Sequence, residues 1–241
     1  MNKTNIFIVA IIFFSYFSLL IGFYLNEDGS GTPLSGDFRD TWPYVVELTK
    51  EIFIDPTPWT LHFPMHYFLL SRLYLIVEDI NIVRFLFFIV ALITPFLFFT
   101  CLKEYLRKSD KIAITFISLT LLFTPSFRYS AIWANDQITF YILVFLGTFF
   151  YLRSKKSNII PAKDINIYLY LVCFAAACYS RQFYSLLYAL FLINILINYG
   201  TKTFIYFSSI SAVLAMPGLA FVLKYPQIFG NLVFSGNIFN S

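Results

Sequence analysis

Long apolar runs separated by short polar segments make up most of this chain. The runs cover residues 5–25, 62–77, 82–102, 112–127, 137–152, 165–180, 183–199 and 204–223. None of them alternates apolar and polar residues as a half-buried strand does, and lipid cannot satisfy the backbone groups of an open strand. The pattern therefore predicts an all-α fold, a polytopic membrane helical bundle in which residues 1–241 form a single transmembrane domain.

Composition supports this class of protein. Hydrophobic residues make up 59% of the sequence and charged residues 12%, whereas soluble domains carry about 25% charged residues. The first run, 5–25, is longer than the apolar region of a secretory signal, which is about 7–15 residues, so we expect an uncleaved anchor. The net charge of +4 comes from bases in short loops. It reports membrane orientation, and no nucleic-acid partner is expected.

The positions of Lys and Arg predict which loops face the cytoplasm. These residues gather in the loops 101–111 and 153–164 and in a short loop around Lys202, and basic loops stay inside. The acid-rich loop 26–61 and the segment 124–136 then lie outside.

The run 62–77 conflicts with this order, because a full span needs about 20 apolar residues and this run is short and carries two histidines. We expect it to be re-entrant or interfacial on the outer side. Seven spans remain, with the amino terminus inside and the carboxy terminus outside. The protein is expected in a bacterial inner membrane or, alternatively, in the endoplasmic reticulum membrane.

With this topology the polar side chains collect at the outer membrane face. Those with the chemistry of a site are Asp37, Asp40, His62, His66, Arg84, Arg128, Asp136, Arg181 and Gln182. The loops on the cytoplasmic side carry little besides Lys and Arg. The chain therefore has one chemically rich face.

The stretch SGDFRDTWPYVVELTKE, residues 35–51, carries two candidate catalytic acids in the outer loop. From Thr41 onward it predicts an amphipathic helix in the membrane interface, with Asp40 as its N-cap and Pro43 in its first turn. Capping and catalysis are equally good readings of Asp40. Asp37 has no capping role. A carboxylate held near lipid has its pKa raised by desolvation, which suits a general base; the alternative is a solvated loop charge.

His62 and His66 stand four residues apart, a spacing that can place two ligands of a metal on one helix face. No third ligand stands beside them, so contacts with the interface or with a substrate are favoured. Asp136 lies where a loop enters a span. A charge at that position is costly and indicates function, although Asn135 or Asp136 can also cap the helix.

Arginine side chains near the outer face are suited to a phosphate group. Arg181 precedes Gln182 between two apolar runs, and a guanidinium binds phosphate through two parallel hydrogen bonds. Arg84 and Arg128 offer the same chemistry. The alternative for all three arginines is that they reach toward lipid head groups from the ends of helices.

The order of these features resembles the GT-C superfamily of integral membrane glycosyltransferases. The resemblance rests on an anchor, an outer loop with Asp37, the segment HFPMHYFLL, a cytoplasmic basic loop and TPSFRYSAIWANDQITFYI. It implies a seven-helix module that uses polyprenyl-phosphate-linked sugars. An acid in the first outer loop is the catalytic base there, and a second acid often lies in the next outer loop, as Asp136 does.

Within that superfamily the chain is similar to the dolichyl-phosphate-glucose alpha-1,2-glucosyltransferases. GDFRDTWPYV resembles their acidic pair followed by an aromatic or His residue and Pro, with Asp37 as the first acid and Phe38 where the second would stand. CYSRQFYSLLYALF resembles their Phe-Arg-Gln-Thr-Asn segment through Arg181 and Gln182. IWANDQITFY is similar to their Tyr-Thr-Glu segment, with Asp136 for the Glu.

The resemblance implies an inverting hexosyltransferase acting on the non-cytoplasmic face. The donor is a polyprenyl-phosphate sugar and the acceptor a glycan or a lipid-linked molecule. The one cofactor that the resemblance allows is a divalent cation, Mg²⁺ or Mn²⁺, near Asp136. Two other classes of function compete: a lipid-linked oligosaccharide flippase or other transporter, and a non-catalytic membrane subunit. A transporter favours ionisable groups at the midplane and internal repeats, and the sequence has no visible repeat.

Overall fold

The computed structural model describes residues 3–27, 36–51, 65–106, 110–157, 160–181 and 185–224, and all regular structure in these ranges is helical. The helices are α1 (Lys3–Tyr24), α2 (Gly36–Glu47), α3 (Met65–Val77), α4 (Ile80–Ala91), α5 (Thr94–Tyr105), α6 (Lys111–Thr120), the short η1 (Leu121–Phe123), α7 (Pro125–Ile132), α8 (Asp136–Ser154), the short η2 (Pro161–Lys163), α9 (Ile165–Ser180) and α10 (Ser185–Lys224). The predicted all-α class is confirmed for these residues.

Among the described helices, 4 are long and apolar enough to cross a membrane, or up to 5 if a bent pair is counted as one span. They are Asn5–Tyr24, the α4–α5 segment Ile80–Tyr105, Asp136–Ser154 and Ser185–Phe221. The chain is therefore a multi-pass membrane protein. Helix α3 has 13 residues. It is therefore about 20 Å long, too short to cross a hydrocarbon core of about 30 Å.

The bent pair differs from the prediction. Helices α6–η1 and α7 meet at an angle of 63°, so most of the segment predicted as an outer loop at 124–136 is helical. Pro125 explains the break. It lacks a backbone N–H and fits the first turn of a new helix, where that group would have no intrahelical partner. Thr124 before it is extended, with φ −74° and ψ 128°.

Helix α10 folds back on itself at Gly200, where φ is 79° and ψ is 175°. Glycine adopts this backbone conformation at no steric cost, whereas a side chain would be strained. The rings of Phe191 and Phe207 are 6.2 Å apart, whereas a straight helix would separate them by about 24 Å. The break predicted between the runs 183–199 and 204–223 is therefore present as a tight turn.

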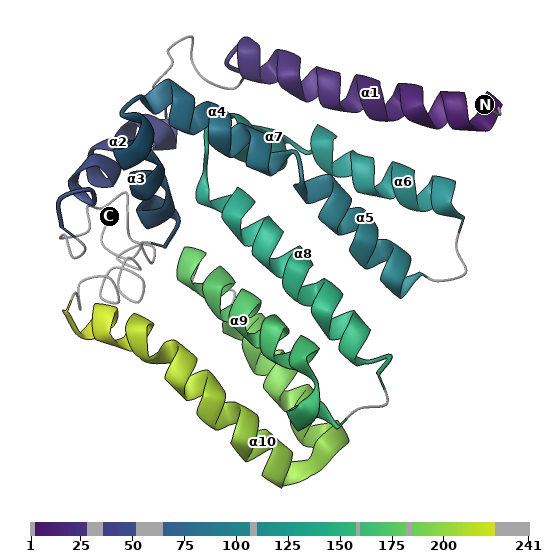
Figure 1. The fold of residues 1–241 in the computed structure, drawn as a ribbon, viewed down its shortest axis with the longest axis vertical. Helices are drawn as coiled ribbons and strands as arrows, with labels where there is room; N and C mark the ends of the chain where they lie inside the picture. The colour runs from purple at the N-terminus through teal and green to yellow at the C-terminus, as the bar shows by residue number, and fades with distance from the viewer. Residues whose placement is uncertain are drawn as a thin grey trace, which may run out of the picture.

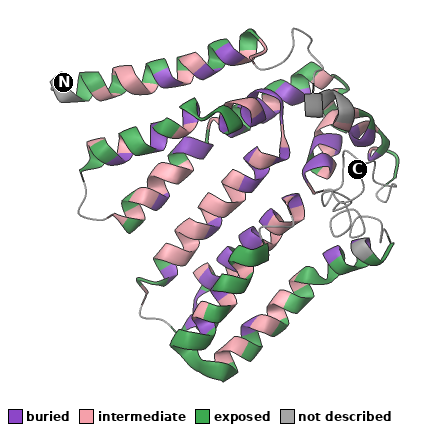
Figure 2. Ribbon diagram, turned by 180° about the vertical axis from the view of Figure 1, so that it is seen from behind, coloured by how far each residue is buried: buried purple, intermediate pink, exposed green. Residues whose placement is uncertain are grey.

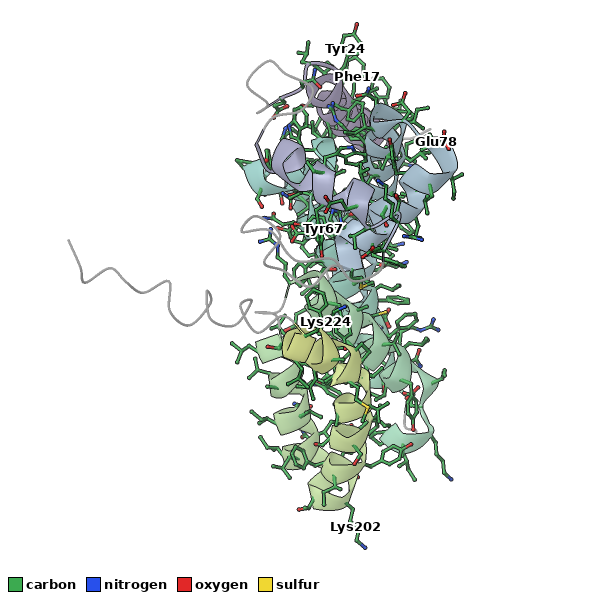
Figure 3. The ribbon with its side chains drawn as sticks, turned by 90° about the vertical axis from the view of Figure 1, so that its left-hand side faces the viewer. Phe17, Tyr24, Tyr67, Glu78, Lys202 and Lys224 are labelled. Carbon is green, nitrogen blue, oxygen red and sulfur yellow. The ribbon has the colours of Figure 1, made fainter. Side chains whose placement is uncertain are left out.

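The helices run back and forth between two ends of the molecule (Figure 1). We call the "polar end" the place where the end of α1, the start of α4, the turn from α7 to α8 and the end of α9 come together. We call the "basic end" the opposite place, where the α8–α9 connection lies beside the turn at Gly200. An ion pair between Lys156 and Glu104 ties the end of α5 to this connection. Tyr24 and Lys202 lie at opposite extremes of the longest axis of the molecule (Figure 3).

Exposed apolar side chains cover the outer surface of the bundle. About half of α1 and most of α10 are exposed (Figure 2), including Phe13 at 60%, Phe14 at 65% and Val213 at 61%. Water would disfavour such a surface, and lipid tails accept it. Two buried cores lie beneath it, one around Leu19, Phe88 and Trp133 and one around Tyr170, Phe191 and Phe207.

Helix α2 corrects the prediction for Asp40. It begins at Gly36, so Asp40 lies inside the helix and is not its N-cap, and Pro43 lies in the interior. The amphipathic pattern itself is confirmed, since Val45 and Leu48 are buried while Glu47 is exposed. The apolar face of α2 therefore packs on protein.

Aromatic contacts carry the packing of α2 on α3. The rings of Trp42 and Tyr74 are 5.3 Å apart and nearly perpendicular, and those of Tyr44 and Tyr67 are 5.7 Å apart. Edge-to-face pairs of this kind add about 0.5–1.5 kcal/mol beyond area burial. They hold the acid-bearing segment at the polar end, which is where Figure 1 shows α2 and α3.

Candidate functional site

Asp136 and Arg181 form an ion pair at the centre of the polar end. Nε of Arg181 lies 2.8 Å from Oδ2 of Asp136, and Nη2 lies 2.7 Å from Oδ1. Asp136 is 3% exposed and Arg181 is 19% exposed. The N-cap of α8 is Asn135, which accepts from the backbone N–H of Gln137. The cap is therefore Asn135, and the carboxylate of Asp136 binds Arg181. This ion pair joins the start of α8 to the end of α9.

His66 on α3 holds the turn that precedes Asp136. Its Nε2 lies 2.8 Å from the carbonyl oxygen of Ala134 and its Nδ1 lies 3.0 Å from the hydroxyl of Thr139. A carbonyl only accepts, so Nε2 donates its proton and Nδ1 accepts from Thr139. Complete burial lowers the pKa of His66 to about 4, so the ring is neutral at neutral pH. Ala134 sits at a φ of 50°, and the bond from His66 fixes this unusual turn.

Arg84 is buried inside the polar end and is 5% exposed. Its Nε donates to the carbonyl of Ile132 at 2.6 Å, and its Nη2 donates to Asn26 Oδ1 at 2.8 Å and to the carbonyl of Phe23 at 3.2 Å. The guanidinium carbon lies 4.5 Å from the ring centre of Phe23 and 4.2 Å from that of Trp133. Arg84 thus joins α1, α4 and α7.

Arg128 on α7 is tied to Glu27, just beyond α1. Its Nε donates to Glu27 Oε1 at 2.6 Å and its Nη2 donates to Oε2. Nη1 donates to the hydroxyl of Ser18 and to the carbonyl of Leu122, and Nη2 also donates to the carbonyl of Ser18. All five N–H groups of a guanidinium therefore have acceptors. The hydrogen bond from Arg128 lowers the pKa of Glu27.

Gly22 on α1 makes room for this pair. A Cβ atom added there would lie 2.7 Å from Nη2 of Arg128 and closer still to Oε2 of Glu27. The backbone of α1 thus approaches the ion pair as closely as glycine allows.

The structure brings five of the predicted site residues to one end of the bundle: His66, Arg84, Arg128, Asp136 and Arg181. Asp37 and Asp40 lie on α2, and the structure describes the backbone of this helix at these two residues. It does not describe their side chains. His62 and Gln182 lie outside the described residues. No group of three or more His, Cys, Asp or Glu side chains that could hold a metal occurs in the described ranges.

Sequence reasoning missed the partners that these residues use. Glu27 was counted only as one of several acids in the outer loop, and Asn26, Trp133 and Thr139 were not singled out. The signal available for Glu27 was its place at the end of the first anchor. Its partner Arg128 is 101 residues away, and nothing local in either segment pairs the two.

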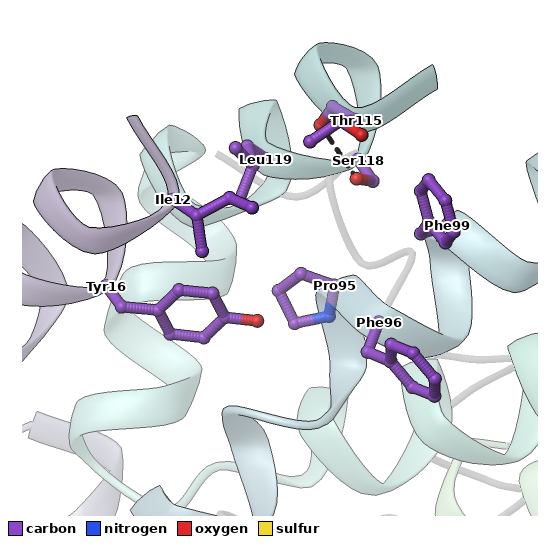
Figure 4. Close-up of a pocket in the computed structure, with 8 residues that line it drawn as sticks. All are labelled: Ile12, Tyr16, Pro95, Phe96, Phe99, Thr115, Ser118 and Leu119. Carbon is purple, nitrogen blue, oxygen red and sulfur yellow. Dashed lines mark hydrogen bonds between the residues drawn. The ribbon is translucent and has the colours of Figure 1, made fainter. Parts of the chain in front are cut away.

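Two of the grooves that border α1 differ in their lining. One, of about 500 Å³, runs along Phe14, Phe17 and Ile21 and ends at the Glu27–Arg128 pair. The other, of about 230 Å³, lies between α1, α5 and α6 (Figure 4). In it the hydroxyl of Tyr16 donates to the carbonyl of Leu92, at the turn between α4 and α5. Only the first groove joins an apolar wall to charged groups.

The fold and this end of the bundle define a class: an all-helical, multi-pass membrane protein with buried ion pairs gathered at one end. No family model, no curated protein and no solved structure matches the chain.

Proposed function

We propose that this protein is a GT-C-type membrane glycosyltransferase, which transfers a hexose from a polyprenyl-phosphate donor to a glycan or lipid-linked acceptor on the non-cytoplasmic face. The observation that carries the proposal is the Asp136–Arg181 pair, which lies at the same end of the bundle as α2. Arg181 keeps 19% of its side-chain surface exposed, and α2 carries Asp37.

The path of the chain supports a seven-helix module. The proposal counts α1, α4–α5, α6–α7, α8, α9 and the two limbs of α10 as passes in alternating directions. Of the described helices, 4, or up to 5 with the bent pair, are long and apolar enough to span by themselves, and α9 is shorter. Helices α2 and α3 come between the first pass and the second, at the polar end. This is the position at which the resemblance expects the outer loop with the catalytic acid.

In this reaction Arg181 binds the donor phosphate and stabilises the charge that builds on it as the leaving group. Asp136 holds the guanidinium in place through two hydrogen bonds. Asp37 takes the proton from the acceptor hydroxyl, and one direct displacement inverts the sugar carbon. Arg128 has all its N–H groups engaged, so its role in the proposal is to fix α1.

The groove that ends at Glu27 and Arg128 supports a lipid-linked donor. Its lining is mostly aromatic and aliphatic, and it measures about 500 Å³. An isoprenoid chain needs an apolar channel of this kind, with its phosphate left at the polar end.

The test is transfer by the purified protein from a panel of polyprenyl-phosphate glucose, mannose and galactose, with a membrane extract of the source cells as the acceptor pool. Asp37→Asn should reduce turnover by about 10²–10⁴-fold while donor binding survives. Arg181→Lys should weaken donor binding. Glu47→Gln is the matched control, because it removes one exposed carboxylate from the same helix and should leave transfer unchanged. Absence of transfer with every donor would reject the proposal.

A non-catalytic membrane subunit is the second candidate. It is favoured by one observation: the guanidinium groups of Arg84, Arg128 and Arg181 all have acceptors within the chain. On this reading the polar end only holds helices together. Arg181→Lys would then change the stability of the protein and leave donor affinity as it is.

A further inference from the structure

The basic end carries a pair of tyrosines that has no part in the reaction proposed for the polar end. The hydroxyl oxygens of Tyr168 on α9 and Tyr206 on α10 are 2.9 Å apart, and the Tyr168 hydroxyl donates to the carbonyl of Ala162 at 2.8 Å. Since a hydroxyl has one proton, Tyr206 must donate to Tyr168. This chain of hydrogen bonds fastens η2 to the second limb of α10.

Two lysines flank this tyrosine pair. Lys163 follows Ala162 directly, and Lys202 stands four residues before Tyr206, on the same side of the helix. Both lysines are exposed, and neither has an ion-pair partner among the described residues. Asp164 does not neutralise them: it is 1% exposed, and its carboxylate accepts from Ser157 and Asn166.

An exposed apolar stripe begins directly beside the lysines. On α9 it consists of Ile165 at 65% exposure, Leu169 at 37% and Val172 at 54%. Their spacing of four and three residues puts them on one face of the helix. The stripe runs from the basic end toward the middle of the bundle, over a length of about 10 Å at 1.5 Å per residue.

We propose that Lys163, Lys202 and the Tyr168–Tyr206 pair form a binding site for one anionic phospholipid of the bilayer leaflet at the basic end. The two ammonium groups bind the phosphate. The oxygen of Tyr206, whose proton is already donated, accepts a hydrogen bond from a hydroxyl-bearing head group. One acyl chain lies on the stripe from Ile165 to Val172. Tyrosines at the level of the head groups, with basic residues beside them, are typical of such contacts. The site does not depend on the glycosyltransferase proposal.

Lipid binding to the purified full-length protein tests the site. Native mass spectrometry in detergent, titrated with phosphatidylglycerol or phosphatidylcholine, gives the affinity for each lipid. Each lysine near a head group contributes about fivefold in affinity. The double variant Lys163→Gln/Lys202→Gln should therefore bind phosphatidylglycerol about 25-fold more weakly. Phosphatidylcholine, which has no net charge, should bind weakly to both proteins.

Lys111→Gln is the matched control, since it removes one exposed charge from the start of α6, in another loop; it should keep the wild-type affinity. Tyr206→Phe keeps the ring and removes the hydroxyl, and we expect a loss of several-fold with both lysines in place. Lys163→Arg/Lys202→Arg should retain binding, because it preserves the charges. Two outcomes would overturn the proposal: equal affinity of the wild type for both lipids, or a double Gln variant that binds phosphatidylglycerol within twofold of the wild type.

Discussion

The arginines of the polar end and two lysines of the basic end, Lys163 and Lys202, have their positive charge compensated in opposite ways. At the polar end Arg84, Arg128 and Arg181 are largely buried, and acceptors of the chain itself surround them. At the basic end Lys163 and Lys202 are exposed and have no described carboxylate partner. Buried cations must be paired because desolvation is expensive. The charge of exposed cations near a membrane can be compensated by water and by lipid head groups.

This contrast indicates that the two ends have different roles. The arginines join helices to one another: α8 to α9, α1 to α7, and α1 to both α4 and α7. Their planar groups offer several donors in fixed directions, which a lysine does not. A site built from them is rigid before any ligand arrives, and rigidity favours a catalytic site. The lysines at the basic end are suited to a mobile partner.

The largest effect tests whether the two ends lie on opposite sides of the membrane. In a background without Cys101, Cys173 and Cys178, a single cysteine at Lys155 and one at Lys50 should label from opposite sides. The expected result is all or none, because basic loops stay in the cytoplasm. An impermeant thiol reagent on intact cells measures it. Labelling of both positions from outside would remove the basis for assigning the polar end to the outer face.

The next effect is the cost of breaking the buried pair. Asp136→Ala leaves Arg181 without its carboxylate, and removal of one partner of a buried pair costs about 3–5 kcal/mol. Denaturant or thermal unfolding in detergent measures the loss. The double variant Asp136→Leu/Arg181→Leu should lose much less than the sum of the two single changes, because no charge stays buried alone. Additive losses would mean that the two side chains do not interact.

A smaller effect is expected from His66. His66→Ala removes two buried hydrogen bonds and should cost about 2–3 kcal/mol. His66→Gln keeps one donor and one acceptor and is the control. Burial lowers the pKa of His66 to about 4, so the unfolded chain binds a proton that the folded chain does not. Wild-type stability should therefore fall as pH drops from about 6.5 toward 4. If the Gln variant shows the same slope, His66 is not its source.

The sequence predicted the positions of several helices, but not their partners. Of the seven spans it predicted, the described residues supply 4, or up to 5, that are long and apolar enough to cross a membrane. The run predicted at 165–180 coincides with α9, Ile165–Ser180, and the run 137–152 lies within α8, because apolar length and flanking polar residues are local signals. The turn at Gly200 also had a local signal, a glycine followed by Lys202. Contacts between helices have none: Asp136 and Arg181 are 45 residues apart. Only the predicted topology indicated that Asp136 and Arg181 lie at the same face of the membrane.

Asp40 shows how a local rule fails. An aspartate before a tryptophan and a proline fits the start of a helix, and this pattern predicts a start at Thr41. The chain begins the helix at Gly36, which puts Asp37 in the first turn, where a negative charge is favoured by the helix dipole. The cost is an interior proline at Pro43, and it is offset by the burial of Tyr44 and Leu48 and by the contact of the Tyr44 ring with Tyr67 of α3. This tertiary contact cannot be read from the local pattern.

The smallest expected effect concerns Glu27, whose contribution to stability is present at neutral pH and is lost in acid. The hydrogen bond from Arg128 lowers the pKa of Glu27, so the folded state favours the carboxylate more than the unfolded state does. The stability that this gives is present above the unfolded pKa of about 4.3 and is lost as pH falls through the folded pKa. Glu27→Gln should therefore be less stable than the wild type at pH 7, and the gap should close below about pH 4.3.

The gap should be about 1 kcal/mol, because Glu27 is 33% exposed and solvent screens part of the attraction. Unfolding in detergent at a series of pH values measures it, with Glu47→Gln as the control for loss of one exposed carboxylate. Gly22→Ala is a second, independent variant. It changes no charge, but its Cβ would lie against Arg128 and Glu27, so it should reduce the same pH-dependent part of the stability. If the wild type and Glu27→Gln differ equally at pH 3 and pH 7, the pair does not form, and α1 is held to α7 by packing alone.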